Sequence, residues 1–254
     1  MSAVHLIWHG AIAELRLDNP AKLNAFTLEM LAHLEAHCTA LAQGQARAVV
    51  ITAEGERAFC TGADINAWGD LGAAEFARGW VRGGHGIFDR LARLPMPTIA
   101  ALSGHAFGGG LELAAACDVR VMAPGATIAL PEAGVGIVPG WSGTQRLARL
   151  IPEPVLREMA LLGRRIGAER AHQMGFVAEV AADARGAAMQ MAEAVLASSP
   201  RATEVAKYMI NAAVGEDRGA MIEALGSGMI AATADKAEGV AAFRAKRKPT
   251  FPGA

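Results

Sequence analysis

The chain has 254 residues, of which 52% are hydrophobic and 19% are charged, so it can bury a sizeable core and is not expected to be disordered. The net charge is −1, and the one tight basic run is Lys246-Arg247-Lys248. A nucleic-acid partner would need a larger basic face, so we expect none. No apolar run reaches the roughly 18 residues that a membrane helix needs, and the N-terminus lacks a secretory pattern, so we expect a cytoplasmic protein without a membrane partner.

The first third of the chain alternates strand and helix patterns. Residues 11–17 alternate apolar and polar side chains, which predicts a strand that Asp18-Asn19-Pro20 ends. Apolar residues at helical spacing over 27–43 predict a helix, with Thr27 as its N-cap and Gly44 as its stop.

Further strands follow this first helix. Short apolar runs predict strands at 48–52, 97–104 and 118–123, and a glycine-rich turn and a helix separate the last two. Strands that alternate with helices indicate an α/β architecture, and their spacing suggests repeated turns of a right-handed ββα unit.

The pattern changes beyond the middle of the chain. Helical spacing dominates there, with one strand near 176–181, and Ser198-Ser199-Pro200 interrupts the pattern. We therefore expect two parts, a core over 1–197 and a C-terminal region over 198–254 that is helical up to Arg247.

Three glycines stand between a predicted strand and a predicted helix in SGHAFGGGLELAAACD (103–118). Glycines at such a turn let the backbone approach a ligand and leave amide N–H groups free. A helix N-terminus also attracts negative charge, and Glu112 lies in the first turn of this helix. The same residues could equally make a tight turn only, with Glu112 complementing the helix dipole.

A second turn, Thr61-Gly62-Ala63, follows a short apolar run and could expose another backbone N–H. Asp64 could cap a following helix. Two exposed amides from separate loops are what an oxyanion hole requires.

A third segment covers residues 129–151, where a predicted strand ends at Pro131-Glu132 and a loop rich in glycine and proline precedes a helix that starts at Gly143. Loops of this composition are commonly functional. Taken alone, Glu132 could be an exposed carboxylate without a role.

The blocks GADI, SGHAFGGGLELAAACD and PEAGVGIVPGWSGTQRLARLI together resemble the crotonase family, also called the enoyl-CoA hydratase/isomerase superfamily. The agreement runs from LNAFT (23–27) to AFRAKRKPTF (242–251), and the central blocks have the family's order and spacing. The resemblance implies an α/β, crotonase-like spiral of ββα turns with a C-terminal helical trimerisation region, so we expect a homotrimer or a homohexamer.

The resemblance also implies roles for single residues. Two backbone N–H groups of the family hold the thioester oxygen of an enolate-like transition state, and by motif they fall on Ala63 and Gly109. Two catalytic glutamates match Glu112 and Glu132, and we assign water activation to Glu112 and exchange of the α-proton to Glu132. Gly140 matches a backbone amide that positions the water. The implied reaction is reversible addition of water across the 2,3 double bond of a trans-2-enoyl-CoA.

The implied substrate is an acyl-CoA thioester, so coenzyme A is part of the substrate and no separate cofactor is expected. The positions that match the family's CoA-binding segments are Lys22, Leu23, Ala25, Asp64, Ile65 and Lys246. Lys246 corresponds to a lysine that reaches the CoA phosphates, often from a neighbouring subunit. Cys38, Cys60 and Cys117 form no CxxC pair, so we expect neither a disulfide framework nor a metal site.

The chain departs from the family pattern at several positions. Gly226-Ser227-Gly228 stands where an aromatic residue near the adenine is common, and Leu130 stands where short-chain hydratases often carry a polar residue. We interpret Trp80 as a core residue and Trp141, inside the catalytic loop, as a wall of the acyl pocket. The preferred acyl group is left open by these differences.

The alternatives to a hydratase are a Δ3,Δ2-enoyl-CoA isomerase, another acyl-CoA lyase of the crotonase family, and a non-catalytic scaffold. An isomerase needs one carboxylate and usually lacks the glutamate after the glycine triplet. A scaffold need not keep both glutamates together with the glycine-lined hole. The pair Glu112 and Glu132 therefore favours hydration.

Overall fold

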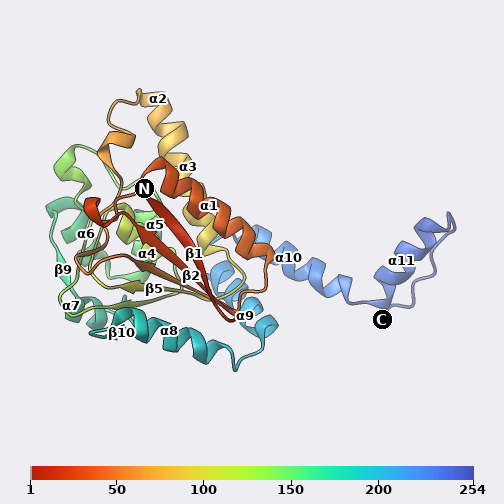
Figure 1. The fold of residues 1–254 in the computed structure, drawn as a ribbon. Helices are drawn as coiled ribbons and strands as arrows, with labels where there is room; N and C mark the ends of the chain where they lie inside the picture. The colour runs from red at the N-terminus through yellow and green to blue at the C-terminus, as the bar shows by residue number, and fades with distance from the viewer. Residues whose placement is uncertain (1) are drawn as a thin grey trace. The chain divides into compact units, whose positions relative to one another are not determined.

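The structure is a computed structural model that describes residues 2–254 (Figure 1). The chain divides into two compact units, one that ends at Pro200 and one that covers Arg201–Ala254.

A six-stranded sheet forms the centre of the first unit. Its strands, in spatial order, are β1 (Ala3–His9), β2 (Ile12–Asp18), β3 (Ala48–Ala53), β5 (Thr98–Leu102), β7 (Val119–Met122) and β10 (Glu179–Val180). β1 and β2 form an antiparallel hairpin, and every other neighbouring pair is parallel. Parallel strands need long crossovers, and these crossovers supply the helices of the unit.

Both faces of this sheet are buried, as the continuous apolar runs of its strands require. Val49 and Ile51 of β3 face the main core, which contains α1 (Leu28–Gln43), whereas Ala48 and Val50 face α8 (Ala184–Val195). Figure 1 shows α8 running along this sheet. The contact of α8 uses small side chains four residues apart, Ala184, Ala188 and Ala192, so the helix lies close to the strands.

A second sheet holds β4 (Ala58–Cys60), β6 (His105–Phe107), β8 (Thr127–Ala129) and β9 (Ile166–Gly167), in that spatial order. Its first three strands are parallel. The chain passes from the first sheet to the second three times, through β3–β4, β5–β6 and β7–β8, and each pair leads into a helical segment. This confirms the α/β spiral of ββα turns.

Two helices of the first unit, α1 and α5 (Gly143–Leu150), begin where the sequence predicts. The Oγ1 atom of Thr27 caps α1 by accepting the N–H of Met30 at 3.2 Å, and Gly44 ends the helix. The remaining helical segments are η1 (Pro20–Lys22), η2 (Ile65–Ala67), α2 (Ala73–Glu75), the π-helix η3 (Phe76–Val81), α3 (Arg82–Ala92), α4 (Gly109–Ala115), η4 (Glu132–Val135), α6 (Glu153–Leu162) and α7 (Ala168–Gln173).

Three strands were not predicted, namely β1, β6 and β9. β6 and β9 have three and two residues, too few for a periodic pattern to form. The strand predicted at 176–181 is real but shorter, since β10 pairs through two residues only.

The second unit is helical, as predicted. It contains most of α9 (Pro200–Ala213), α10 (Arg218–Ala231) and α11 (Ala234–Arg244). The prediction of helix up to Arg247 was too long, because Arg247 turns back to form an ion pair with Glu238 of α11 at 2.6 Å. No helix within residues 2–254 has both the length and the apolar character needed to cross a bilayer.

Candidate active site

The site lies at one edge of the second sheet. The turn 61–63 follows β4, the glycine triplet 108–110 follows β6, and Glu132 follows β8. Because β4, β6 and β8 are parallel neighbours, their carboxyl ends meet at the same edge. Three segments far apart in the sequence are therefore brought together by strand pairing alone.

Two backbone N–H groups at this edge are unpaired. Phe26 pairs with the turn by donating to Gly62 O and by accepting from Asp64 N, both at 2.8 Å, which leaves the N–H of Ala63 between them. Gly109 is the first residue of α4, so its N–H has no partner within the helix. Neither N–H finds an acceptor anywhere in the described part of the chain.

Gly62 brings these two amides together. Its φ of +104° favours glycine, and a Cβ atom there would lie 3.5 Å from the N atom of Gly109 and 3.4 Å from Phe107 O. The loops after β4 and β6 therefore touch, and two unpaired N–H groups from separate loops are what an oxyanion hole requires.

Glu112 is held by the loop that precedes α5. Its side chain is 3% exposed, and Oε1 accepts the N–H of Trp141 at 2.7 Å and the N–H of Gly143 at 2.8 Å. Burial raises the pKa of Glu112, while these two N–H groups and the charge of Arg146 act in the opposite direction. The two N–H groups thus fix the orientation of the carboxyl group, and they offset only part of the effect of burial on its pKa.

Glu132 has a different environment. It is 7% exposed, and its buried Oε2 atom has no hydrogen-bond partner among the described residues. Burial, with a further contribution from the charge of Glu112, raises the pKa of Glu132 to about 7. Glu112 and Glu132 line the same cavity, so the two carboxyl groups converge although 20 residues of sequence separate them.

Both glutamates and both loops line one cavity of about 180 Å³. Its other walls are mostly apolar and include Trp68, Phe76, Trp80, Val81, Ile137, Val138 and Trp141. A small apolar cavity with a few convergent polar groups and shifted pKa values has the character of an active site.

Comparisons with known proteins agree with this geometry. The family described as Enoyl-CoA hydratase/isomerase matches residues 8–254. The chain belongs to this family. It is 37% identical to the putative enoyl-CoA hydratase/isomerase YngF of Bacillus subtilis, with 95% of each chain covered. It is 31% identical to the short-chain-enoyl-CoA hydratase of Clostridium acetobutylicum, over 94% of this chain and 93% of the relative.

A solved structure with the same fold is Pseudomonas aeruginosa DspI, with a TM-score of 0.82 and 34% identity over 98% of this chain and 96% of the other. The crystal structure of an enoyl-CoA hydratase from Bacillus anthracis has a TM-score of 0.80 and 31% identity over 99% of each chain. Members of the enoyl-CoA hydratase/isomerase family are enzymes, and the chain has the crotonase fold that its motifs predict.

Trp141 lines the site of this family member and is firmly fixed. Its ring lies 5.2 Å, between centroids, from the rings of Trp80 and Phe88, and its Nε1 atom donates to Trp80 O at 3.2 Å. A Cβ atom on Gly84 or on Gly109 would collide with the indole. The ring therefore occupies a slot built from two glycines, and Trp80, which is buried as predicted, also lines the cavity.

The other residues that match family roles do not all line this cavity. Gly140 and Ile65 line the same cavity as the glutamates. Asp64 caps η2 by accepting the N–H of Asn66 at 3.1 Å, and it forms an ion pair with Lys22, which holds the pKa of Asp64 below its usual range. Ala25 is buried.

Lys246 belongs to the second unit, where it follows α11, and its contact with coenzyme A stays a prediction. Within residues 2–254, no group of three or more histidine, cysteine, aspartate or glutamate side chains could hold a metal ion.

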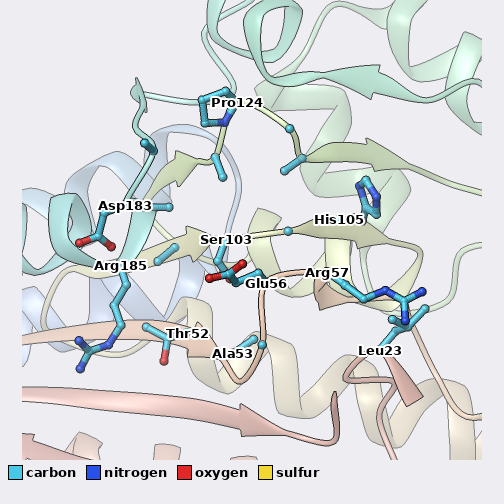
Figure 2. Close-up of a pocket in the computed structure, with 18 residues that line it drawn as sticks. Leu23, Thr52, Ala53, Glu56, Arg57, Ser103, His105, Pro124, Asp183 and Arg185 are labelled. Carbon is cyan, nitrogen blue, oxygen red and sulfur yellow. The ribbon is translucent and has the colours of Figure 1, made fainter. Parts of the chain in front are cut away.

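Figure 2 shows a larger cavity of about 850 Å³ at the carboxyl ends of β3, β5 and β7. Leu23 lines this cavity, whereas neither Glu112 nor Glu132 does. Its charged lining mixes Arg57 and His105 with Glu56, and Arg185 is already paired with Glu14 at 2.8 Å. This cavity is larger but lacks the converging amides and carboxyl groups, so it is not the candidate reaction site.

The side chains of Arg146 and Ser142, which support Glu112 or the loop that holds it, were not predicted from the sequence. Arg146 is 3% exposed and its charge favours the ionised form of Glu112, and Ser142 lies in the loop that holds this carboxylate. Neither residue carries a local pattern that distinguishes it from an ordinary helix or loop residue. One pattern in the sequence could have indicated polar partners for them: His85 and Asp89 lie four residues apart, on one face of α3.

Proposed function

We propose that this protein is an enoyl-CoA hydratase that adds water reversibly across the 2,3 double bond of a trans-2-enoyl-CoA. The observation that carries the proposal is the convergence of two buried glutamates with different environments beside two unpaired backbone N–H groups. The isomerase needs only one of these carboxyl groups, whereas hydration has a task for each.

The hole would bind the thioester oxygen. As water adds to the β-carbon, electron density moves through the double bond onto this oxygen, and the N–H groups of Ala63 and Gly109 would stabilise the enolate-like state. Donors of this kind typically contribute about 3 kcal/mol of transition-state stabilisation each.

Glu112 is assigned as the base. Its ionised carboxylate, oriented by the N–H groups of Trp141 and Gly143, would accept a proton from the attacking water while the water oxygen bonds to the β-carbon. Gly140 lines the same cavity, and its N–H would bind this water.

Glu132 is assigned as the acid. With a pKa of about 7, it is largely protonated in mildly acidic solution and can release a proton near neutrality. Its proton would pass to the α-carbon of the enolate, which completes the addition of one water. One proton must then return from Glu112 to Glu132, and the reverse sequence dehydrates the product.

The CoA portion would bind near Asp64, Ile65 and Lys22, with Lys246 meeting its phosphates as a point charge. Trp141 would form the fixed wall against which the acyl group packs. The cavity has a volume of about 180 Å³. With Trp141 as a fixed wall, this volume favours a short or flat acyl group over a long flexible chain.

The proposal is tested by loss of the conjugated thioester absorbance when purified protein meets short, medium, branched and aromatic enoyl-CoAs. We expect Glu112→Gln and Glu132→Gln each to lower kcat by about 10²–10⁴-fold while binding of a CoA thioester persists. A folded protein that turns over no member of the panel would overturn the proposal, as would a near-wild-type rate in either variant.

The Δ3,Δ2-enoyl-CoA isomerase is the second candidate, and the unpartnered Oε2 atom of Glu132 favours it, since a free carboxyl oxygen suits a proton shuttle. The two candidates differ in their need for Glu112. Isomerisation of a 3-enoyl-CoA that survives Glu112→Gln and is lost in Glu132→Gln would place the isomerase first.

A further inference from the structure

The loop that holds Glu112 is itself fastened to α3. Trp141 and Gly143 donate the two N–H groups that fix the carboxylate, and Ser142 and Arg146 stand beside them. Both of these polar side chains are buried and both contact residues of α3. We define the α3 clamp as His85, Asp89, Ser142 and Arg146.

One half of the clamp is an ion pair. The Nη2 atom of Arg146 donates to Oδ1 of Asp89 at 2.6 Å, and the arginine side chain is 3% exposed. The second oxygen of Asp89 lies 3.5 Å from His85 Nε2 and 3.5 Å from Arg93 Nη2. Asp89 is therefore the anionic centre through which α3 reaches α5.

The other half joins His85 to Ser142. The serine hydroxyl lies 3.0 and 3.1 Å from the two ring nitrogens of His85. Ser142 has φ +77° and ψ +11°, a left-handed conformation that is strained for a residue with a side chain and not for glycine. A serine at this strained position keeps a contact that glycine could not make.

A third contact comes from the segment that precedes α3. Trp80 lies in the π-helix η3, where Arg82 N donates to Ala77 O, five residues back. The carbonyl of Trp80 accepts Nε1 of Trp141 at 3.2 Å. π-helical turns are frequent at functional sites, and here the turn supplies one end of a hydrogen bond to the loop that holds Glu112.

We propose that His85 and Asp89 of α3 are positioning residues for the reaction, because they hold Ser142 and Arg146 and thereby hold the loop amides on Glu112. The kinetic consequences rest on the proposed hydratase function. The hold of the loop amides on Glu112 also affects the ionisation of this carboxyl group, which is measurable without turnover.

Loss of the clamp is expected to change the ionisation of Glu112. Arg146 favours ionised Glu112, so Arg146→Gln is expected to raise the pKa of Glu112, and Arg146→Lys to restore it in part. Asp89 holds Arg146, and through it the loop amides that favour the ionised carboxylate, so Asp89→Asn is also expected to raise the pKa of Glu112. A purely electrostatic role of the Asp89 charge would lower it instead. The other charged groups that bear on this balance are Glu132 beside Glu112, and His85 and Arg93 beside Asp89.

The experiment follows the carboxyl carbon of Glu112 by ¹³C NMR in protein labelled at glutamate, with the signal assigned by its loss in Glu112→Gln. Arg157→Gln is the matched control, since Arg157 forms an exposed ion pair on α6. We expect the titration midpoint to move up in Arg146→Gln and in Asp89→Asn, and not at all in the control. A midpoint that stays or falls in folded Asp89→Asn overturns the clamp, even if Arg146→Gln does not fold.

Kinetics provide the second readout. If the wild type hydrates an enoyl-CoA, Asp89→Asn and His85→Gln should lower kcat on the order of tenfold to 100-fold with KM changed little, because a misplaced catalytic group affects the chemical step. Ser142→Gly should lower kcat while its melting temperature equals or exceeds that of the wild type. Unchanged kcat in all three variants overturns the proposal.

The two proposals can fail separately. A wild type without hydratase activity whose Glu112 midpoint shifts as predicted would refute the proposed function and support the clamp. Normal hydration with no shift in either variant would refute the clamp alone.

Discussion

Glu132 shows, at the scale of single residues, that a site can be built at the expense of stability. Its carboxyl group is buried, and its Oε2 atom lacks a partner in residues 2–254. Such a group is stable in the fold only when protonated, so its pKa rises to about 7. A sequence optimised for stability alone would have a neutral or well-paired side chain at this position.

The stability prediction follows from the sign of this shift. As pH rises from about 4.5 to about 7, the unfolded chain loses the Glu132 proton while the folded chain keeps it, so the free energy of unfolding falls over this window. Glu132→Gln removes the effect and should be more stable than the wild type at pH 8 by about 1–3 kcal/mol. Denaturant unfolding at pH 4 and pH 8 measures the difference.

The matched control for that measurement is Glu153→Gln, because Glu153 is exposed on α6 and forms an exposed ion pair. An equal gain of unfolding free energy in both variants, or no gain in Glu132→Gln, would show that burial of the ionised Glu132 carboxylate does not destabilise the fold.

Sequence alone identified the two glutamates and the two amides through their motifs, but it could not show that they converge. The unequal environments of Glu112 and Glu132 arise from contacts across the fold, such as the N–H of Gly143, which lies 31 positions from Glu112. Leu23 and Ala25 show the opposite case, since a motif match placed them near the site and the structure puts Leu23 in the larger cavity and buries Ala25.

At the scale of elements, the loop before α5 is fitted closely to Glu112. A Cβ atom on Gly143 would lie 2.7 Å from Oε1 and 2.8 Å from Cγ of Glu112, so this glycine is needed for a close approach and not for a special φ. Gly143→Ala should displace the carboxylate and lower kcat on the order of 100-fold. Steady-state kinetics of the purified variant measure this.

Gly134→Ala is the control for that change, because its added Cβ would meet no atom within 4 Å. Comparable activity in both variants would mean that the close contact of Gly143 with Glu112 does not matter for catalysis.

The packing of α8 gives a prediction about stability alone. Ala188 is fully buried against the six-stranded sheet, so Ala188→Leu should overpack this interface and cost about 1–3 kcal/mol of unfolding free energy. Ala194→Leu, on the exposed side of the same helix, should change stability little. Thermal or denaturant unfolding separates them, and equal stability would contradict the close approach of α8.

Helices and long strands were predictable because their periodicity extends over many residues, as in α1 with its Thr27 cap. The short strands were not. β6 has three residues between glycine-containing turns and owes its existence to pairing with β4 and β8. The turns that depend on it, and hence the position of Gly109, are set by pairing that a local pattern does not encode.

At the scale of the whole molecule, the second unit leaves large apolar side chains exposed in the single chain. They include Met209, Ile210, Met229 and Ile230, and Phe243 is 86% exposed. Exposed apolar surface of this extent marks an association surface, and the resemblance to the crotonase family implies trimers. We propose that the chain forms a homotrimer or a pair of stacked trimers.

Sedimentation analysis tests this directly. The expected mass is three or six times the 26.3 kDa of one chain, and Phe243→Asp should shift the population toward smaller species. The exposed Glu153→Gln variant serves again as the control. A wild type that stays monomeric at micromolar concentration would contradict the proposed assembly.

We propose that two carboxyl groups divide the addition of one water between them. Mass spectrometry of the product formed from a trans-2-enoyl-CoA in water enriched in oxygen-18 and deuterium tests this division. We expect the wild type to place oxygen-18 on the β-carbon and one deuterium on the α-carbon, and Glu112→Gln to place neither at a comparable rate. Deuterium incorporation without oxygen-18 by the wild type would contradict hydration.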